Sequence, residues 1–357
     1  MKKICYVLSY KDPKYIRTRV LLRTLRKNHK FTVVTAINET TGIFRYADTI
    51  LRLIFIRLKH RPDIYLLGFR GHEILWLVRA ITAGKPLIFD EFININAWLD
   101  EHTKQENHSF LKSLIKKYMK YGMAKCQLIL TDTKLHARLS SEYYKLNENL
   151  FAHVYVGTDE QTFYKTQVAQ RKKININVLF YGSFLPLHGI KYILEAAKLL
   201  NDNNHIKFTL VGGSNDDEQN IRDYVEENNL SNIYYRRWVE YDKLPNLIEE
   251  ADICLGGPFG DTPQSNRVIT GKTFQFLAAA KPILIGYIDE NVGFLDKTNC
   301  LLVKQGSSKN IATQIIWAYE NKDKLAKIGK RGQNLYKSKF SNQNIANRLS
   351  LLISKIY

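Results

Sequence analysis

The sequence predicts an α/β protein of two Rossmann-like domains, each a doubly wound parallel sheet. Its 357 residues are too many for one compact core and suit two domains of ordinary size. Short apolar, β-branched runs alternate with segments of helical periodicity along the whole chain, a pattern typical of βαβ units. We expect the two domains to face a central cleft, with ligands bound at the carboxyl ends of the strands.

The predicted strands are continuous apolar runs, as strands buried on both faces of a sheet usually are. In the first half they span residues 3–8, 31–35, 64–68, 86–89, 127–131 and 152–156, and in the second half 177–181, 207–211, 233–236, 253–255, 282–285 and 300–303. A polar, basic stretch over 164–177 is typical of a linker. We therefore predict an N-terminal domain at 1–165, a C-terminal domain at 166–340 and a final helix within 341–357, with packing back onto the N-terminal domain as one option.

Composition narrows the possible functions and partners. The formal net charge is +19, and residues 1–165 hold 28 lysines and arginines against 15 acids. Such a basic half indicates an anionic partner, which is membrane phospholipid, a phosphorylated acceptor or nucleic acid. The four scattered cysteines form no close pair, so we expect reduced, buried thiols in a cytoplasmic protein rather than a zinc or redox site. The apolar run at 4–8 is too short for a signal peptide, and no run reaches the ~18–20 residues of a membrane span.

The most informative stretch, 251–286, consists of a strand, a glycine-rich loop, a helix and a second strand. Thr270 is the expected N-cap of that helix, whose free amides and dipole suit a phosphate. Arg267 and Lys272 add full positive charges, and the amide of Gln275 can reach a ribose or sugar hydroxyl. The alternative is an ordinary βαβ unit with a solvated lysine.

Four motifs follow one another from about residue 150 onward: 154–163 resembles N-G-V-D-x-x-x-F, 178–190 resembles G-R-l-x-x-x-K-G, 210–213 resembles i-v-G-x-G, and 272–282 resembles K-x-F-E-x-m-A-x-G-k-P. In this order they resemble the retaining family 4 glycosyltransferases, which have the GT-B fold. The resemblance implies a nucleotide-sugar donor in the C-terminal domain. It also implies retention of anomeric configuration and no metal, because cations and a helix N-terminus stabilise the leaving diphosphate.

The sequence departs from the family at four of these positions. The family's glutamate pair falls on Arg267 and Gln275, and the arginine and lysine of its glycine turn fall on Ser183 and His188. We interpret this as a subfamily variant in which charge is exchanged between loops. The donor-binding candidates are Gly182, Ser183, His188, Gly213, Trp238, Val239, Arg267, Thr270, Gly271, Lys272 and Gln275. Trp238 stands where the family holds the nucleotide base, and a core or interdomain position is the alternative for its ring.

The N-terminal half resembles the family more weakly. Asp90 stands where the family often has a histidine that touches the transferred sugar, and an acid there could steady positive charge at the anomeric carbon. His72 is a further candidate, and helix capping is the alternative role for both. With Arg267 and Lys272 they complete the predicted catalytic set. We predict no metal ligands, and the acidic run 216–218 is typical of a solvated helix start.

Two basic amphipathic segments, 15–27 and 109–126, suit an anionic membrane surface. The alternative is that their apolar stripes pack on the sheet while the cations are solvated.

The preferred hypothesis is a retaining, metal-independent glycosyltransferase. It would move a sugar from a UDP- or GDP-sugar to a glycan or lipid-linked acceptor for a cell-surface polysaccharide, at the inner face of the plasma membrane. A catalytically silent relative, a nucleic-acid binder and a sugar-nucleotide epimerase are the alternatives, although no nucleic-acid motif is present.

Overall fold

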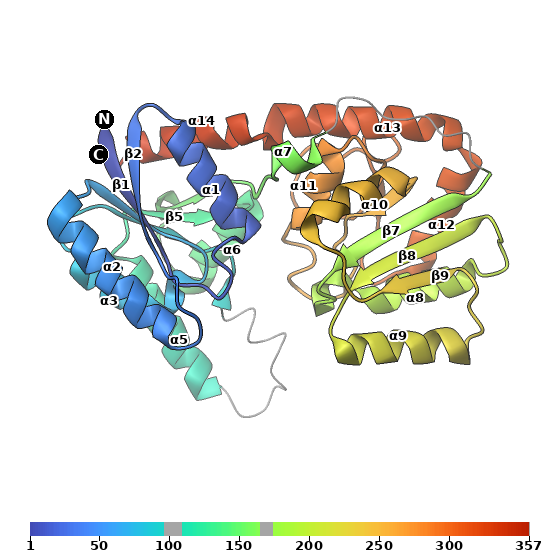
Figure 1. Ribbon diagram of the computed structural model, residues 1–357, viewed down its shortest axis with the longest axis horizontal. Helices are drawn as coiled ribbons and strands as arrows, with labels where there is room; N and C mark the ends of the chain where they lie inside the picture. The colour runs from blue at the N-terminus through green and yellow to red at the C-terminus, as the bar shows by residue number, and fades with distance from the viewer. Residues whose placement is uncertain (96–108, 165–173, 357) are drawn as a thin grey trace. The chain divides into compact units, whose positions relative to one another are not determined.

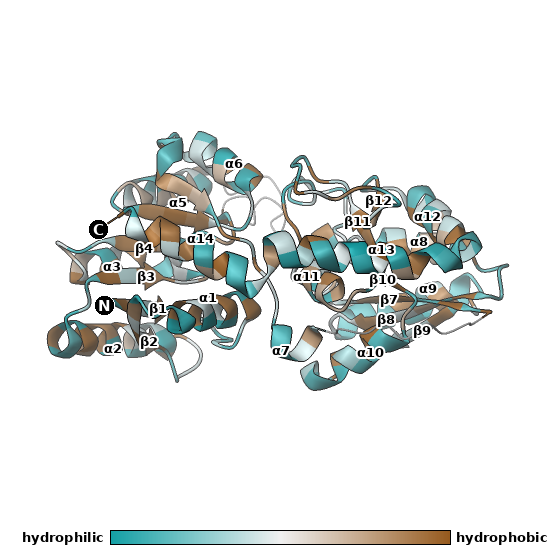
Figure 2. Cartoon of the chain, turned by 90° about the horizontal axis from the view of Figure 1, so that it is seen from above, coloured by the Kyte–Doolittle hydropathy of each residue, from teal (hydrophilic) through white to brown (hydrophobic). Residues whose placement is uncertain are grey.

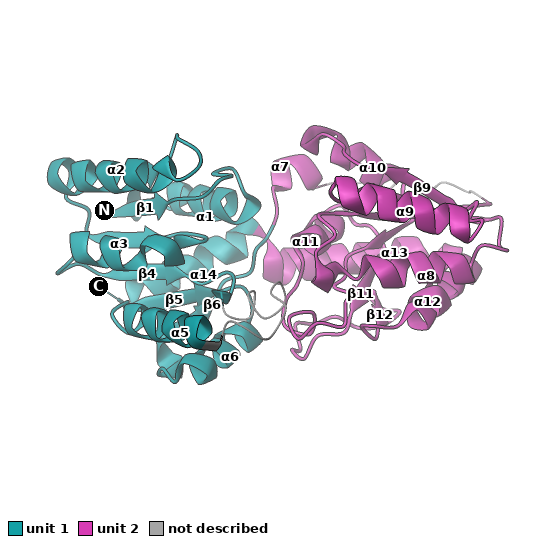
Figure 3. Cartoon of the chain, turned by 90° about the horizontal axis from the view of Figure 1, so that it is seen from below, with its two compact units in different colours: residues 1–157, 342–357 teal, residues 158–341 magenta. Residues whose placement is uncertain are grey.

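The computed structural model describes residues 1–95, 109–164 and 174–356, which form two compact units (Figures 1 and 3). Unit 1 contains Met1–Gly157 and Asn342–Tyr357, and unit 2 contains Thr158–Ser341. Each unit has a six-stranded sheet, and every strand pairing within the two sheets is parallel. The α/β fold class and each predicted strand are therefore confirmed.

The sheet of unit 1 has the order β2-β1-β3-β4-β5-β6. Its strands are β1 (Lys2–Leu8), β2 (Phe31–Ile37), β3 (Ile64–Leu67), β4 (Leu87–Asp90), β5 (Leu128–Thr131) and β6 (Phe151–His153). The strands β1, β3, β4 and β5 are almost wholly buried, which explains their unbroken apolar sequences. The edge strand β2 is only half-buried.

Helices cover both faces of this sheet. On one face, α1 (Ile16–Lys27) packs beside α14 (Asn342–Ser354), and their buried side chains share a core with β1 and β3. The other face carries α2 (Phe44–His60), α3 (Leu75–Ile81), α5 (Ser109–Met123) and α6 (Lys134–Tyr144), which share a second core with the same sheet. Short 3₁₀ turns span Gly71–Ile74 and Glu148–Leu150.

The sheet of unit 2 has the order β12-β11-β10-β7-β8-β9. Its strands are β7 (Ile176–Gly182), β8 (Ile206–Gly212), β9 (Ile233–Arg236), β10 (Ile253–Leu255), β11 (Ile283–Gly286) and β12 (Leu301–Val303). From β7 the chain builds one half of the sheet through β8 and β9, and it then returns to β10 on the other side. The topological switch point therefore lies between β7 and β10, where open α/β sheets bind ligands.

The helices of unit 2 are α7 (Glu160–Phe163), α8 (Ile190–Leu199), α9 (Asn215–Glu227), α10 (Leu244–Glu250), α11 (Gly271–Ala278), α12 (Ser308–Glu320) and α13 (Lys322–Leu335), followed by a π-helical turn at Tyr336–Phe340. Further 3₁₀ turns span Pro186–His188 and Tyr241–Lys243. Ser214 and Asp217 form a capping box at the start of α9. The acidic run 216–218 is thus a helix start, as predicted.

The units divide at Gly157, earlier than the boundary predicted at residue 165. The physical reason is that α7 already packs within unit 2. Phe163 makes an edge contact with Tyr241 at 5.4 Å between ring centroids, and the Tyr336 hydroxyl donates to Glu160 at 2.9 Å. Most of the predicted linker at 164–177 lies outside the described residues, and β7 begins at Ile176.

Candidate functional site

Glycines bring the ends of β7 and β8 close together, next to the switch point between β7 and β10. Gly212 has φ +121°, and a Cβ atom there would lie 1.8 Å from the Gly182 carbonyl oxygen. The Gly213 amide donates to that same oxygen at 3.1 Å. Only glycine tolerates this approach, which leaves the strand ends free of side chains where a ligand would bind.

The helix α11 begins beside this edge with its first turn uncapped by any side chain. Thr270 occupies the N-cap position, as expected, and its hydroxyl donates to the Gly256 carbonyl at 2.5 Å and lies 3.1 Å from the Thr273 hydroxyl, but it caps no amide of the helix. The predicted N-cap position is confirmed, while the hydroxyl is directed to the strand end after β10 and leaves the first helix amides without a side-chain cap in the described structure. The amides of Gly271 and Lys272 in the first turn remain suited to an anion, which the helix dipole favours.

Lys272 is a buried cation in the first turn of α11. Its residue exposure is 7%, and its Nζ lies 4.7 Å from the centroid of the Phe180 ring. A Cβ atom on Gly182 would lie 3.3 Å from Lys272 Cε, which places the side chain beside the end of β7. Burial lowers the pKa of Lys272 to about 7. An anion bound here would restore the full charge that burial disfavours.

His188 lies next to Lys272. A Cβ atom on Gly182 would meet the His188 ring at 3.3–3.4 Å, and the imidazole makes an edge contact with Phe180 at 6.0 Å. Burial, together with the nearby Lys272 charge, lowers the pKa of His188 well below its ordinary value, so the ring is neutral. Its Nδ1 is buried without a hydrogen-bond partner in the described structure, which suits a polar ligand atom.

Gln275 is held further along α11. Its Oε1 accepts a hydrogen bond from the Tyr181 hydroxyl at 2.5 Å, and both side chains are largely buried. The carbonyl end of the amide is therefore engaged, and a ligand hydroxyl would meet the amide nitrogen. Tyr181 is a site residue that the sequence did not reveal, because nothing in a strand sequence indicates which helix its hydroxyl will reach.

The remaining predicted residues lie at the margins of this cluster. Ser183 is exposed beyond β7, and Arg267 is half-buried in the loop between β10 and α11. Trp238 follows β9, 77% exposed, with half-buried Val239 beside it. The tryptophan is thus no part of the core of unit 2, and its ring is accessible for stacking on a base.

Asp90 ends β4 in unit 1 and is fully buried in an ion pair. Its carboxylate meets the Arg17 guanidinium at 2.8 Å, and both side chains are 0% exposed. Arg17 also donates to the Val154 carbonyl at 2.5 Å. Direct contact between Asp90 and a sugar, as the sequence suggested, would require this pair to open. The pair also corrects the view of 15–27 as a membrane helix, because α1 turns Arg17 and its apolar residues toward the sheet.

His72 lies in the 3₁₀ turn after β3, and β3 pairs with β4, which ends at Asp90. The two catalytic candidates of unit 1 therefore share one edge of the sheet. Burial lowers the pKa of His72 to about 4, so its half-buried ring is neutral.

A second buried polar group at this edge escaped sequence reasoning. Glu91 follows Asp90 and is 1% exposed, with His136 and Ser140 as its polar neighbours. Burial raises the pKa of Glu91 to about 7. After β5, His136 Nδ1 lies 2.8 Å from Asp132 Oδ1. The available signal was an acid directly after each of two neighbouring buried strands.

Within residues 1–95, 109–164 and 174–356, no cluster of three His, Cys, Asp or Glu side chains is arranged to hold a metal ion. The helices in the same part of the chain are all too short or too polar to span a bilayer.

Comparison with known proteins places this geometry in a chemical class. Residues 175–321 match the family model described as "Glycosyl transferases group 1", which lies within unit 2. This match indicates a glycosyltransferase. No curated protein matches the sequence.

Solved structures show the fold. The chain is similar to HepE of Anabaena in complex with UDP and glucose, at TM-score 0.73 and 14% identity over 99% of this chain and 100% of that one. It is similar to sucrose-phosphate synthase of Thermosynechococcus elongatus at TM-score 0.79 and 14% identity, over 100% and 99%. It is also similar to a glycosyltransferase of Rickettsia africae, at TM-score 0.71 and 13% identity, over 99% of this chain and 98% of that one. The predicted GT-B fold is confirmed.

Proposed function

We propose that the protein transfers a sugar from a UDP- or GDP-sugar, bound in unit 2, to a glycan or lipid-linked acceptor. The observation that carries the proposal is the buried Lys272 at the uncapped start of α11, beside His188 and the glycine edge of β7. A desolvated cation next to free helix amides suits an anion such as a diphosphate. That HepE was solved with UDP and with UDP-glucose supports the same donor class.

Different residues of unit 2 would bind different parts of the nucleotide-sugar donor. The α11 amides and Lys272 hold the diphosphate and stabilise the negative charge that develops on it as the bond to the sugar breaks. Arg267, in the loop that precedes α11, adds a second cation. The Gln275 amide nitrogen binds a sugar or ribose hydroxyl, and Trp238 stacks on the base.

We propose that the reaction needs no metal and retains the anomeric configuration. The cation and the helix N-terminus provide the charge stabilisation that a divalent ion provides elsewhere. The leaving phosphate oxygen would take the proton of the acceptor hydroxyl, so that no protein carboxylate is needed as a base.

The basic first half of the chain favours an anionic acceptor complex. We therefore place the enzyme at the inner face of the plasma membrane, in the assembly of a cell-surface polysaccharide on a lipid carrier. The 28 lysines and arginines against 15 acids in residues 1–165 support this placement.

One observation favours a second candidate, a catalytically silent relative that binds nucleotide sugar or a partner enzyme. Arg267 and Gln275 stand where the resembled family has glutamates, so two acids are missing from the donor site.

A thermal-shift screen with UDP, GDP, ADP, CMP and their sugar conjugates, with EDTA present, tests the first step. A concentration-dependent rise in melting temperature with one nucleotide class is expected. Turnover of that conjugate, followed by release of the free nucleoside diphosphate, then separates the enzyme from the silent relative. No shift with any nucleotide would refute the donor site.

A further inference from the structure

The helix α2 of unit 1 turns an apolar stripe toward solvent. Leu51, Ile54, Phe55 and Leu58 follow the i, i+3, i+4, i+7 spacing of one helix face and are 67%, 40%, 57% and 72% exposed. A different face, which includes Leu53, enters the core. A surface helix of a globular protein normally places such a stripe inward, so the outward stripe indicates a partner.

The neighbouring helices extend this apolar surface. The stripe of α5 also faces outward, with Leu111 and Leu114 50% and 48% exposed, whereas Met119 is buried. Leu77 of α3, a helix that contacts both α2 and α5, is 56% exposed. We name these side chains the outer face; it comprises Leu51, Ile54, Phe55, Leu58, Leu77, Phe110, Leu111, Leu114, Tyr118 and Tyr121. Brown, apolar stretches along α2 and α5 are visible in Figure 2.

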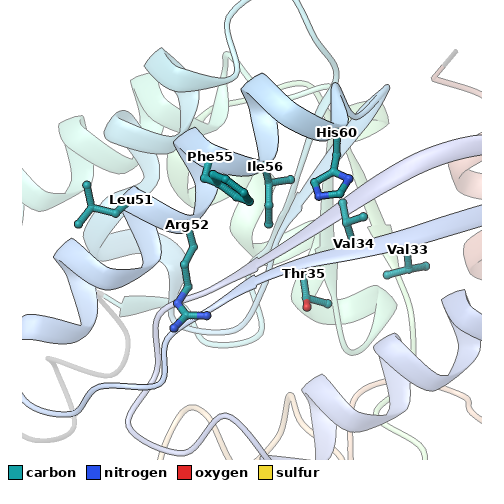
Figure 4. A pocket seen from close by; sticks show the side chains of 8 residues that line it. All are labelled: Val33, Val34, Thr35, Leu51, Arg52, Phe55, Ile56 and His60. Carbon is teal, nitrogen blue, oxygen red and sulfur yellow. The ribbon is translucent and has the colours of Figure 1, made fainter.

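An open groove continues the outer face to the edge of the sheet. Figure 4 shows Leu51 and Phe55 of α2 across from the exposed edge strand β2. The groove has a volume of about 550 Å³ and is lined by Val33, Val34, Thr35, Leu51, Arg52, Phe55, Ile56 and His60. Its lining is mainly apolar and also includes His60 and Arg52, which pairs with Asp48 and Glu39.

The charge around the outer face selects among occupants. The helices α2, α3 and α5 carry Arg45, Arg52, Arg57, Lys59, Arg79, Lys112, Lys116, Lys117 and Lys120, against the single acid Asp48. Arg52 pairs with Asp48 and Glu39, and Arg45 pairs with Glu73, so the excess of positive charge rests mainly on the other cations. Two copies of this chain joined through the face would bring these like charges together, which is unfavourable. A nucleic acid would use the cations and leave the leucines and Phe55 exposed to water. An anionic bilayer satisfies both, because apolar side chains enter the interface while cations meet the headgroups.

We propose that the outer face docks on an anionic phospholipid bilayer, with the stripe of α2 inserted at the headgroup boundary. The helix α1 takes no part, since its apolar side chains and Arg17 are buried against the sheet. The proposal deepens the membrane placement given under the proposed function and rests on it, but its evidence lies in unit 1, so it can be tested separately from the donor chemistry proposed for unit 2.

Vesicle flotation of the full chain tests the proposal. The protein should float with phosphatidylcholine vesicles that contain about 30 mol% phosphatidylglycerol, remain unbound with phosphatidylcholine alone, and detach as salt rises. The double variant Leu51→Ser/Phe55→Ser should reduce the fraction bound by roughly tenfold or more, because two apolar side chains no longer leave water. Leu199→Ser/Tyr287→Ser is the matched control, since these unit 2 side chains are 55% and 57% exposed.

Equal flotation of the double variant and the wild type would overturn the proposal, as would equal loss in the control. Absence of binding to anionic vesicles would also overturn it. Sedimentation velocity without lipid tests whether a second copy of the chain binds the outer face instead. A wild-type dimer that is lost in Leu51→Ser/Phe55→Ser would assign the face to a second copy and overturn the proposal. Melting temperature, with and without UDP, is measured in parallel. A retained melting transition shows that the variant is folded, and the UDP shift reports on the donor site separately.

Discussion

Replacing Lys272 by methionine should stabilise the free protein and lower its affinity for a nucleoside diphosphate. Methionine keeps an unbranched apolar stem against Phe180 and removes only the charged end. In the free protein that charge is buried without a compensating carboxylate among the described contacts, as the low pKa of Lys272 reflects. In the donor complex proposed above, the same charge would face the diphosphate. One substitution therefore acts in opposite directions on stability and on affinity.

The magnitude follows from the pKa of Lys272, which burial lowers from 10.5 to about 7. At about 1.4 kcal/mol per pKa unit, the buried ammonium form costs up to about 5 kcal/mol. Between these two pKa values the unfolded chain binds more protons than the folded chain, so this group makes stability rise with pH. From pH 7 to 9 the rise attributable to Lys272 is on the order of 2 kcal/mol. Lys272→Met should abolish that rise and increase the free energy of unfolding at pH 7 by up to about 4 kcal/mol.

The affinity of the protein for a nucleoside diphosphate should fall in Lys272→Met. Loss of one hydrogen bond to a charged group weakens diphosphate binding by about 1.5–3 kcal/mol, or roughly 10- to 150-fold. Wild-type affinity should also fall as pH rises above about 7, because the lysine must gain a proton to bind the anion. The variant should lack this dependence.

Urea denaturation at pH 7 and pH 9, with titration calorimetry of UDP and GDP, measures both effects. Lys198→Met is the matched control, because Lys198 is exposed on α8. Unchanged diphosphate affinity in Lys272→Met would remove the lysine from the donor site. If Lys272→Met were less stable than the wild type at pH 7, the hypothesis that Lys272 is a desolvated cation in the free protein would be refuted.

Three further predictions concern both units. Asp90→Asn should lower the free energy of unfolding by about 3–5 kcal/mol in chemical denaturation, because it leaves the buried Arg17 charge unpaired; a change within error would mean that the pair is open in solution. Glu91→Gln should stabilise the protein at pH 8 by up to about 3 kcal/mol but not at pH 4, because the pKa of Glu91, raised from 4.5 to about 7, makes stability fall as pH rises through this range; equal effects at both pH values would contradict this. Trp238→Ala should leave the melting temperature unchanged and weaken nucleotide binding by about 1–3 kcal/mol, and full affinity would remove the ring from the base site.

The strands were predictable because burial on both faces of a sheet requires an apolar sequence, which can be recognised without knowledge of the tertiary structure. A strand covered on both faces is apolar at nearly every position, as in Ile253–Leu255 or the first three residues of Leu128–Thr131, and short runs of this kind differ visibly from the helices between them. The domain boundary was less visible. The helix Glu160–Phe163 is polar except for Phe163, so the contacts that assign it to unit 2 are made by side chains distant in sequence.

Side-chain partners were the part that sequence could not provide. Thr270 was correctly placed before α11, but its choice of the Gly256 carbonyl depends on a strand end that folding brings near. Arg17 shares a helix face with Val20 and Leu21, which places its side chain inward. Its partner, Asp90, lies far along the sequence at the end of β4, so the pair could not be predicted. The outward stripe of α2 is a similar case. Periodicity reveals that an apolar face exists, but a helix packed on a sheet through a neighbouring face leaves that stripe in water.

The neutral side chain at position 188 reduces the electrostatic cost of burying Lys272 in the proposed donor site. The resembled family has a lysine where His188 stands, and a second ammonium beside the buried Lys272 would add repulsion to its desolvation cost. A neutral imidazole removes that repulsion and still offers a polar nitrogen to the ligand. The missing cation would then be provided from the half-buried loop position of Arg267, where charge is less costly. On this reasoning, positive charge at the buried wall rests mainly on one lysine, so donor affinity should depend on pH near neutrality.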